Sequence, residues 1–258
     1  MGSIENPQHS FTAPPESATF DGLLFDMDGT IIESTPAVIK HWTAIGNEIG
    51  VQPEVILEEV QATSFDFWSV HLTTSHGRRT IDVLKILSPE KANWEYVQYM
   101  EGLLPEKYGD DAEEVPGARA LLQDLISNNS PWAIVTSGST PLVTGWLRVL
   151  GLPQPEHLVS AESVAHGKPD PACYRLGREK LGLAGDDKQI LVLEDAPAGI
   201  KAGKAAGCKV VGLVTSHTVD QVLAAEPDWI IKDLSSLKFV SAEGGKVTLE
   251  FRDALVKP

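Results

Sequence analysis

Short strand-like runs alternate with segments of helical periodicity between residues 19 and 231, and this alternation constrains the fold more than any other feature. The expected strands are Thr19–Phe25, Trp132–Thr136, His157–Ser160, Gln189–Leu193, Lys209–Val214 and Trp229–Ile231. The helices expected between them are Ala118–Asn128, Thr140–Leu150, Pro171–Leu181, Gly199–Ala206 and Val219–Ala224. Elements of these lengths build βαβ units. The sequence therefore predicts an α/β fold, with a Rossmann-like, doubly wound parallel sheet.

One interval interrupts the alternation and predicts a second domain. From Thr35-Pro36 to about Asp111 no comparable strand is expected. Thr35 is expected to cap a helix that has Pro36 at its first position. The helices expected here are Ala37–Ile49, Pro53–Ala62, Arg79–Leu87 and Trp94–Leu103. This block predicts a helical cap domain over residues 35–112, inserted into a core of residues 19–34 and 113–258.

The remaining segments give weaker indications. Residues 1–18 are polar and contain prolines, so we expect a disordered tail, without the apolar stretch of a signal peptide. The segment KVTLEF, Lys246–Phe251, is expected to be an edge strand. Neither cysteine, Cys173 or Cys208, lies in a metal-binding or redox spacing, so both are expected to be buried thiols. A cytoplasmic location is the default expectation.

The net charge of −15 bears on the partners of the chain. A strongly acidic protein is poorly suited to nucleic acid or to an anionic membrane surface, and we expect neither as a partner. No apolar run approaches the roughly 20 residues that cross a membrane. An anionic substrate would need a local positive site, because the overall field repels it. We expect a monomer that binds a small substrate.

Two aspartates, Asp26 and Asp28, end the first expected strand and precede Gly29. Residues two apart in a strand face the same way, so both carboxylates start on one side of the chain. Such close carboxylates repel each other unless a cation holds them or they share a proton. Taken alone, this pattern is more often a turn with local hydrogen bonds than a site.

Three more polar groups follow other expected strands. The segment Thr136-Ser137-Gly138 offers a hydroxyl and N–H groups before a helix, which suit an anion or a simple helix cap. Lys168 stands in HGKPDP, where prolines fix the chain; an ordinary surface lysine is the alternative. Glu194-Asp195 end an apolar strand, and capping of the next helix by Asp195 is the alternative there.

Together these residues predict a chemistry. Parallel strands bring their carboxyl ends to one edge of the sheet, where such folds bind ligands. Carboxylates favour a hard cation such as Mg²⁺. Thr136, Lys168 and the metal would suit a phosphoryl group, whose transfer depends on positioning and charge neutralisation. One carboxylate is then available as a nucleophile and a second for proton transfer.

The motifs FDMDGT, VTSG, GKPDP and LEDAPAGI, in this order, resemble the four motifs of the haloacid-dehalogenase-like superfamily. The resemblance runs from about Phe20 to Asp233, and the helical block resembles the C1 type of cap. It implies that Asp26 is the nucleophile that forms an aspartyl-phosphate. It implies that Asp28 is the acid and base, because phosphatases and phosphomutases have aspartate there whereas dehalogenases do not.

The same resemblance assigns the other residues of the motifs. Thr136 would hold phosphoryl oxygens, together with Ser137 and Gly138, and Lys168 would steady the phosphate and the nucleophile. The ligands implied for Mg²⁺ are Asp26, the carbonyl of Asp28, Asp195 and, directly or through water, Glu194.

A narrower resemblance lies in and around the cap. SHGRRTIDVL, EGLLPEKYGDDAEEVPGA and EDAPAGIKAGKAAGCKVVG resemble fungal glycerol-phosphate phosphatases and their 2-deoxyglucose-6-phosphate phosphatase relatives. It implies that Arg79 and His76 contact the substrate, with surface residues at a helix start as the alternative. Arg78 departs from the pattern, which has a bulkier apolar or aromatic residue there.

The expected activity is therefore Mg²⁺-dependent hydrolysis of a small phosphorylated polyol or sugar. Glycerol phosphate is the first choice of substrate, and a sugar phosphate such as 2-deoxyglucose 6-phosphate is the next. A phosphosugar mutase is the alternative, because it would use the same motif residues. A non-catalytic binding module is disfavoured because none of the motif residues is lost.

Overall fold

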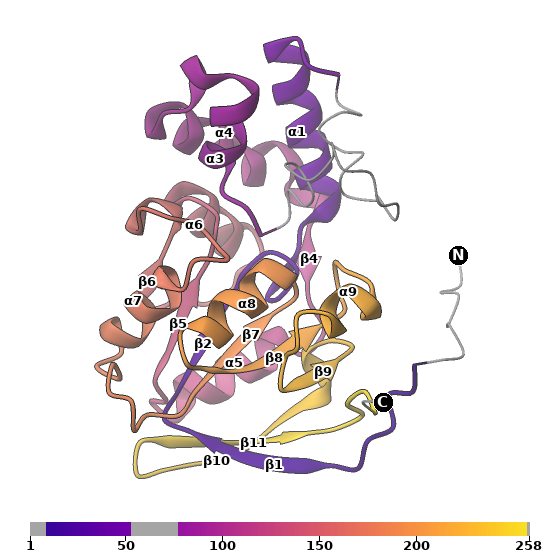
Figure 1. Ribbon diagram of the computed structural model, residues 1–258, viewed down its shortest axis with the longest axis vertical. Coiled ribbons are helices and arrows are strands. Elements are labelled where there is room, and N and C mark those ends of the chain that lie inside the picture. The colour runs from indigo at the N-terminus through magenta and orange to yellow at the C-terminus, as the bar shows by residue number, and fades with distance from the viewer. Residues whose placement is uncertain (1–8, 53–76, 257–258) are drawn as a thin grey trace.

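The computed structural model describes residues 9–52 and 77–256, and its centre is a six-stranded parallel sheet (Figure 1). The strand order is β6-β5-β2-β7-β8-β9, and every neighbouring pair runs parallel. The strands are β2 Gly22–Phe25, β5 Trp132–Val135, β6 Leu158–Val159, β7 Ile190–Glu194, β8 Lys209–Leu213 and β9 Trp229–Ile231. The predicted α/β class with a doubly wound sheet is confirmed.

Helices cover both faces of this sheet. They are α5 Ala118–Ser127, α6 Thr140–Val149, α7 Ala172–Lys180, α8 Pro197–Ala205 and α9 Val219–Leu223. Successive side chains of a strand point to opposite faces, so Leu23 and Phe25 join the hydrophobic cluster that contains α5 and α6 residues. Leu24 joins the cluster that contains α7 and α8 residues. Burial on both faces explains why the central strands are continuously apolar.

A second, antiparallel sheet lies beside the first and corrects two predictions. Its strands are β1 Glu16–Phe20, β10 Leu237–Glu243 and β11 Lys246–Phe251, in the order β1-β11-β10. The segment KVTLEF was expected at an edge but is the central strand, because β1 and β10 both pair with it. Residues 16–18 were expected in a disordered tail but form the start of β1.

The predicted strand Thr19–Phe25 is broken at Asp21, so that β1 and β2 belong to different sheets. The buried carboxylate of Asp21 accepts a hydrogen bond from the Gln189 N–H at 2.8 Å. It also lies 3.2 Å from Lys246 Nζ on β11. These contacts tie the junction of the two strands to both sheets, and a continuous apolar pattern does not reveal them.

The cap helices are α1 Thr35–Ile49, α3 Thr80–Leu87 and α4 Trp94–Tyr108. Short 3₁₀ helices lie at Pro89–Lys91 and Gly109–Asp111, and two more lie outside the cap at Ala161–Ser163 and Leu234–Ser236. The cap helices share a small core of their own that includes Trp42, Ile45 and Leu84. The predicted helix Pro53–Ala62 lies outside the described residues.

Two short strands mark the places where the chain passes between the sheet and the cap. β3 Ile32–Glu33 and β4 Glu113–Glu114 pair antiparallel, so the outgoing and returning segments lie side by side. Helix α1 begins one residue earlier than predicted, with Ser34 at the N-cap position and Thr35 already helical. The Ser34 hydroxyl makes no capping bond because it donates to Asp28.

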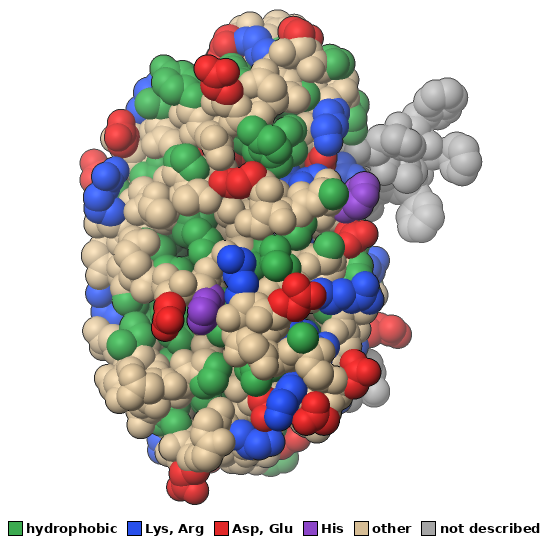
Figure 2. All heavy atoms as spheres, turned by 90° about the vertical axis from the view of Figure 1, so that its left-hand side faces the viewer, with side chains coloured by type: hydrophobic (Ala, Val, Ile, Leu, Met, Phe, Trp, Pro, Cys, Tyr) green, Lys and Arg blue, Asp and Glu red, His purple; other side chains and the backbone are tan. Residues whose placement is uncertain are grey.

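The surface carries charges of both signs. On the face shown in Figure 2, basic and acidic side chains are interspersed, and the basic ones do not form a continuous strip. Among the described residues, no helix combines the length and the apolar character needed to cross a membrane.

Candidate active site

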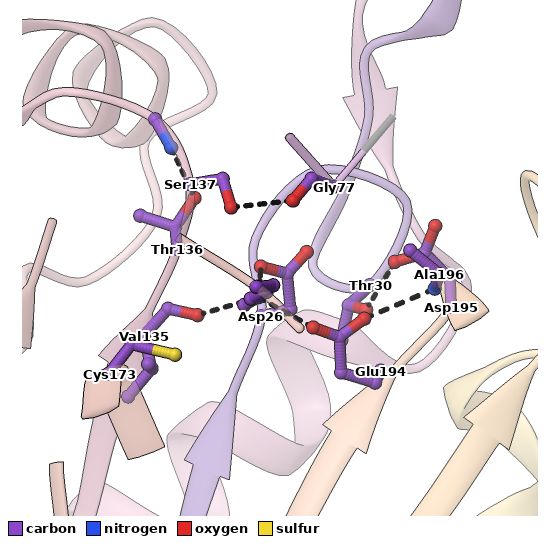
Figure 3. A network of polar contacts seen from close by, with 12 residues as sticks. Asp26, Thr30, Gly77, Val135, Thr136, Ser137, Cys173, Glu194, Asp195 and Ala196 are labelled. Carbon is purple, nitrogen blue, oxygen red and sulfur yellow. Dashed lines mark hydrogen bonds and ion pairs between the residues drawn. The ribbon is translucent and has the colours of Figure 1, made fainter. Parts of the chain in front are cut away.

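The motif residues meet at the carboxyl ends of three neighbouring strands (Figure 3). Asp26 follows β2, Thr136 follows β5 and Glu194 ends β7, and β2 lies between the other two strands. Lys168, in the loop before α7, joins them. Its Nζ lies 2.5 Å from Asp26 Oδ1 and 2.5 Å from Glu194 Oε1, and it donates to the Val135 carbonyl at 3.2 Å.

Lys168 is buried, with 5% of its surface exposed, and remains charged. Burial alone would favour the neutral amine, but the carboxylates of Asp26 and Glu194 outweigh it and raise the Lys168 pKa. Glu194 is held by the Tyr174 hydroxyl at 2.7 Å from Oε1 and by the Ala196 N–H at 3.1 Å from Oε2. The predicted contact between Lys168 and Asp26 is present, and the surface-lysine alternative is wrong.

Asp26, Glu194 and Asp195 form a cluster that fits a metal ion. Each offers one oxygen, and these atoms lie within 4.8 Å of one another. All three residues are buried, and the oxygen donors suit a hard cation. The carboxylate of Asp28 is not part of this cluster; its carbonyl as a metal ligand stays a prediction.

The carboxyl groups of the cluster need more positive charge than Lys168 alone supplies. Burial, together with Glu194 and Asp195, raises the pKa of Asp26, and Lys168 only opposes this rise. Burial and then repulsion from Glu194 raise the pKa of Asp195 to about 7, against hydrogen bonds from Ser216 and Thr30. A bound divalent cation would favour the ionised forms of these groups. The residues present therefore fit the metal that the sequence predicts.

The Asp28 carboxyl group turns toward the entrance of the cap. Ser34 donates a hydrogen bond of 2.5 Å to Asp28 Oδ1, and Thr30 donates at 3.0 Å to Asp195 Oδ1. Gly29, between Asp28 and Thr30 in the sequence, has φ +83°, and a Cβ there would lie 2.2 Å from Asp195 Oδ2. Glycine is needed here both for the left-handed backbone and for the close approach of the Asp195 carboxylate.

The segment after β5 makes contacts within the core and with the cap. The Thr136 hydroxyl oxygen accepts a bond from the Gly138 N–H at 3.0 Å. The Ser137 hydroxyl donates to the Gly77 carbonyl of the cap at 2.7 Å (Figure 3). Thr136 thus makes a hydrogen bond within its own segment, and its part in holding a phosphoryl group stays a prediction. The hydroxyl of Ser137 joins the two parts of the chain.

A small cavity of about 60 Å³ lies where the cap meets the strand ends. Asp26, Asp28 and residues 136–138 line it from the core. The cap side includes Val38, His41, Trp42, Arg78, Thr80 and Glu101. Both aspartates and Thr136 therefore line the same cavity. Sequence patterns gave no signal for His41 and Glu101, because these residues come from two separate helices, α1 and α4.

The two adjacent arginines, Arg78 and Arg79, lie in different surroundings. Arg79, predicted to contact substrate, does not line the cavity, whereas Arg78 does. The buried guanidinium of Arg79 donates to the carbonyls of Ala161 at 3.2 Å, Val164 at 2.8 Å and Ala165 at 3.0 Å. Arg79 thus ties the cap to the core loop, and Arg78 supplies the positive charge beside the cavity. The other predicted contact, His76, lies outside the described residues.

We expect the substitution Arg79→Met to lower the free energy of unfolding by about 2–3 kcal/mol, because three carbonyls lose their donor. Chemical denaturation of the purified full chain measures the change. Arg175→Met is the matched control: this exposed arginine makes one bond of 3.3 Å to the Ala205 carbonyl, and a change within about 0.5 kcal/mol is expected. Equal effects of the two substitutions would show that Arg79 does not hold the cap.

Comparisons with known proteins agree with this geometry. A model of haloacid dehalogenase-like hydrolases matches residues 20–207. The chain belongs to this family. It is 38% identical over 252 residues to glycerol-1-phosphate phosphohydrolase 1 of Saccharomyces cerevisiae, with 95% of each chain covered. It is 32% identical to 2-deoxyglucose-6-phosphate phosphatase 1 of the same yeast, covering 92% of this chain and 97% of that protein.

A solved structure extends the comparison to the fold. The structure of a hydrolase from Pseudomonas syringae matches with a TM-score of 0.63 at 24% identity, over 83% of this chain and 94% of that chain. At this identity the match shows the fold alone. The family and the likeness to fungal glycerol-phosphate and deoxyglucose-phosphate phosphatases, both predicted from the motifs, are confirmed. The chain is an enzyme of the hydrolase class.

Proposed function

We propose that this hydrolase is an Mg²⁺-dependent phosphatase for a small phosphorylated polyol or sugar, with glycerol phosphate as the first choice and 2-deoxyglucose 6-phosphate as the next. The observation that carries the proposal is the contact of 2.5 Å between Lys168 and Asp26, beside an acidic cluster and below a cavity that Asp28 and Thr136 line. The name of the glycerol-phosphate relative supports the choice of substrate.

The residues divide the reaction between them. Lys168 holds the Asp26 carboxylate in place, and Asp26 Oδ attacks phosphorus. The bond from phosphorus to the alcohol oxygen breaks while Asp28 gives that oxygen a proton. Asp28 then takes a proton from water, which attacks the aspartyl-phosphate and releases inorganic phosphate from Asp26. Ser34 fixes the orientation of the Asp28 carboxyl group for both transfers.

Other groups stabilise the phosphoryl charge. Thr136, with the N–H groups of Ser137 and Gly138, would hold the phosphoryl oxygens. Mg²⁺, held by Asp26, Asp195, the Asp28 carbonyl and Glu194, would neutralise the charge that develops on the transferred group. Transfer of the phosphoryl group back to sugar would make the enzyme a mutase, which remains the alternative.

We further propose that residues 35–112 form a cap domain over a core of residues 19–34 and 113–258, which β1 extends to Glu16. The enzyme would act in the cytoplasm as a monomer, without nucleic acid or membrane partners, in keeping with its net charge of −15.

A phosphate-release assay over a panel of esters tests the function. With Mg²⁺, we expect kcat/KM for glycerol 1-phosphate to exceed that for 2-deoxyglucose 6-phosphate about tenfold, which is about 1.4 kcal/mol of transition-state binding. Removal of Mg²⁺ by a chelator should lower the rate about 10²-fold or more. Full activity in chelator would refute the metal. A hexose 1-phosphate that isomerises without free phosphate would favour the mutase.

A further inference from the structure

The inference begins with a buried nitrogen that has no hydrogen-bond partner. His41, on α1, is 5% exposed and lines the cavity above Asp26 and Asp28. Its Nε2 has no partner among the residues that the structure describes. An unsatisfied buried polar group costs about 1–3 kcal/mol, so it calls for an explanation. A ligand that occupies the cavity would supply the missing partner.

The other polar groups on the cap side of the cavity are already engaged. The Glu101 carboxylate accepts bonds from the Ser139 N–H at 2.7 Å and from the Thr80 side chain. Within the described part of the chain, several buried side-chain polar atoms have no partner, and His41 is the residue among them that lines this cavity. The unmet hydrogen bond therefore belongs to a cap residue that lines the same cavity as Asp26 and Asp28.

The surroundings of His41 indicate which chemical group fits. Burial, assisted by the charge of Lys107, lowers the pKa of His41 to about 4, so the imidazole is neutral at neutral pH. A neutral imidazole has one nitrogen that donates and one that accepts, and a hydroxyl can meet either. The apolar side chains of Val38, Trp42 and Leu142 line the same cavity and suit the carbon atoms of a short alcohol.

We propose that His41 Nε2 binds a hydroxyl of the alcohol part of the substrate and thereby selects phosphate monoesters of hydroxylated alcohols over those of plain alkyl alcohols. The inference rests on the proposed phosphatase function and extends it to a residue that sets specificity. His41 takes no part in the transfer itself, because it contacts the part of the ester that leaves.

The test compares two esters with the same carbon chain, glycerol 1-phosphate and propyl phosphate, on the purified full-length enzyme with Mg²⁺. His41→Phe keeps a flat ring of similar size but removes the nitrogen. It should lower kcat/KM for glycerol 1-phosphate about tenfold, which is the loss of one hydrogen bond. The value for propyl phosphate should stay within about twofold. His41→Gln, whose amide can reach the position of Nε2, should restore part of the loss.

His157→Phe is the control, because this half-buried histidine lies before β6, away from the cavity. It should change neither value. If His41→Phe lowers kcat/KM equally for both esters, or for neither, then His41 serves packing. The inference is then overturned while the phosphatase function stands. Should His41→Phe fail to fold, His41→Gln decides alone: the ratio between the two esters must shift. If the wild-type enzyme releases phosphate from none of the esters of the panel, both the proposed function and the inference fail.

Discussion

The substitution Asp26→Asn is expected to lower kcat for phosphate release by about 10³-fold or more, with glycerol 1-phosphate and with p-nitrophenyl phosphate alike. The amide is a poor nucleophile and a poor metal ligand, and it removes the negative charge 2.5 Å from Lys168 Nζ. Because asparagine has nearly the same volume, the circular dichroism spectrum should not change. The measurement is the rate of phosphate release under saturating substrate.

A surface carboxylate provides the comparison for this substitution. Asp124 is exposed on α5, and Asp124→Asn removes the same charge without touching the site. It should retain full activity. If purified Asp26→Asn releases phosphate as fast as Asp124→Asn, then Asp26 is not the nucleophile and the proposed reaction is wrong.

The substitution Lys168→Met should have the largest effect on stability. It leaves the carboxylates of Asp26 and Glu194 buried without their ammonium partner, which costs about 3–5 kcal/mol when a buried ion pair loses one member. Denaturation in urea at neutral pH, with chelator present so that no metal compensates, measures the loss. Activity should also fall, because Asp26 loses the charge that holds it.

The pH dependence of this loss has a definite sign. Without Lys168, burial raises the pKa of Asp26 further above its unfolded value. Between the unfolded and the folded pKa values of Asp26, the folded state binds more protons than the unfolded state. The stability of the variant therefore falls as pH rises through this range, and it recovers toward acid pH. The loss relative to wild type should therefore shrink on acidification.

Lys204→Met is the matched control for Lys168→Met. Lys204 pairs with Asp228 at 2.9 Å, but 39% of its side chain is exposed, and Lys209 also reaches Asp228 at 2.8 Å. Such a pair contributes about 0–1 kcal/mol. Similar losses at Lys168 and Lys204 would contradict the view that the buried pair holds the site together.

The core of the site could be predicted because it depends on few rules. Parallel strands end at one edge, so apolar runs followed by Asp26, Thr136 and Glu194 place these residues together without knowledge of their contacts. Gly29 added a local requirement that the structure explains by its positive φ and by the approach of Asp195. The pattern of apolar strands and the positions of the polar residues after them were thus enough to predict which residues meet at the sheet edge.

The cap side of the cavity could not be predicted in the same way. Whether Arg78 or Arg79 faces the cavity depends on where α3 begins, and the structure places Arg79 at its N-cap with an extended backbone. If α3 began one residue earlier or later, a different arginine would line the cavity and a different one would bind the core. His41 and Glu101 meet through the packing of α1 against α4, which no local pattern encodes.

The pairing of β3 with β4 has a consequence for how such an enzyme can diversify. Ile32 lies opposite Glu114 and Glu33 opposite Glu113, so the chain departs from the sheet and comes back at neighbouring points. A segment with adjoining ends can be lengthened, shortened or exchanged as a module, since the gap that it bridges stays the same. Under the proposed function, the wall that would contact the alcohol can therefore evolve while the carboxylates at the strand ends are left undisturbed.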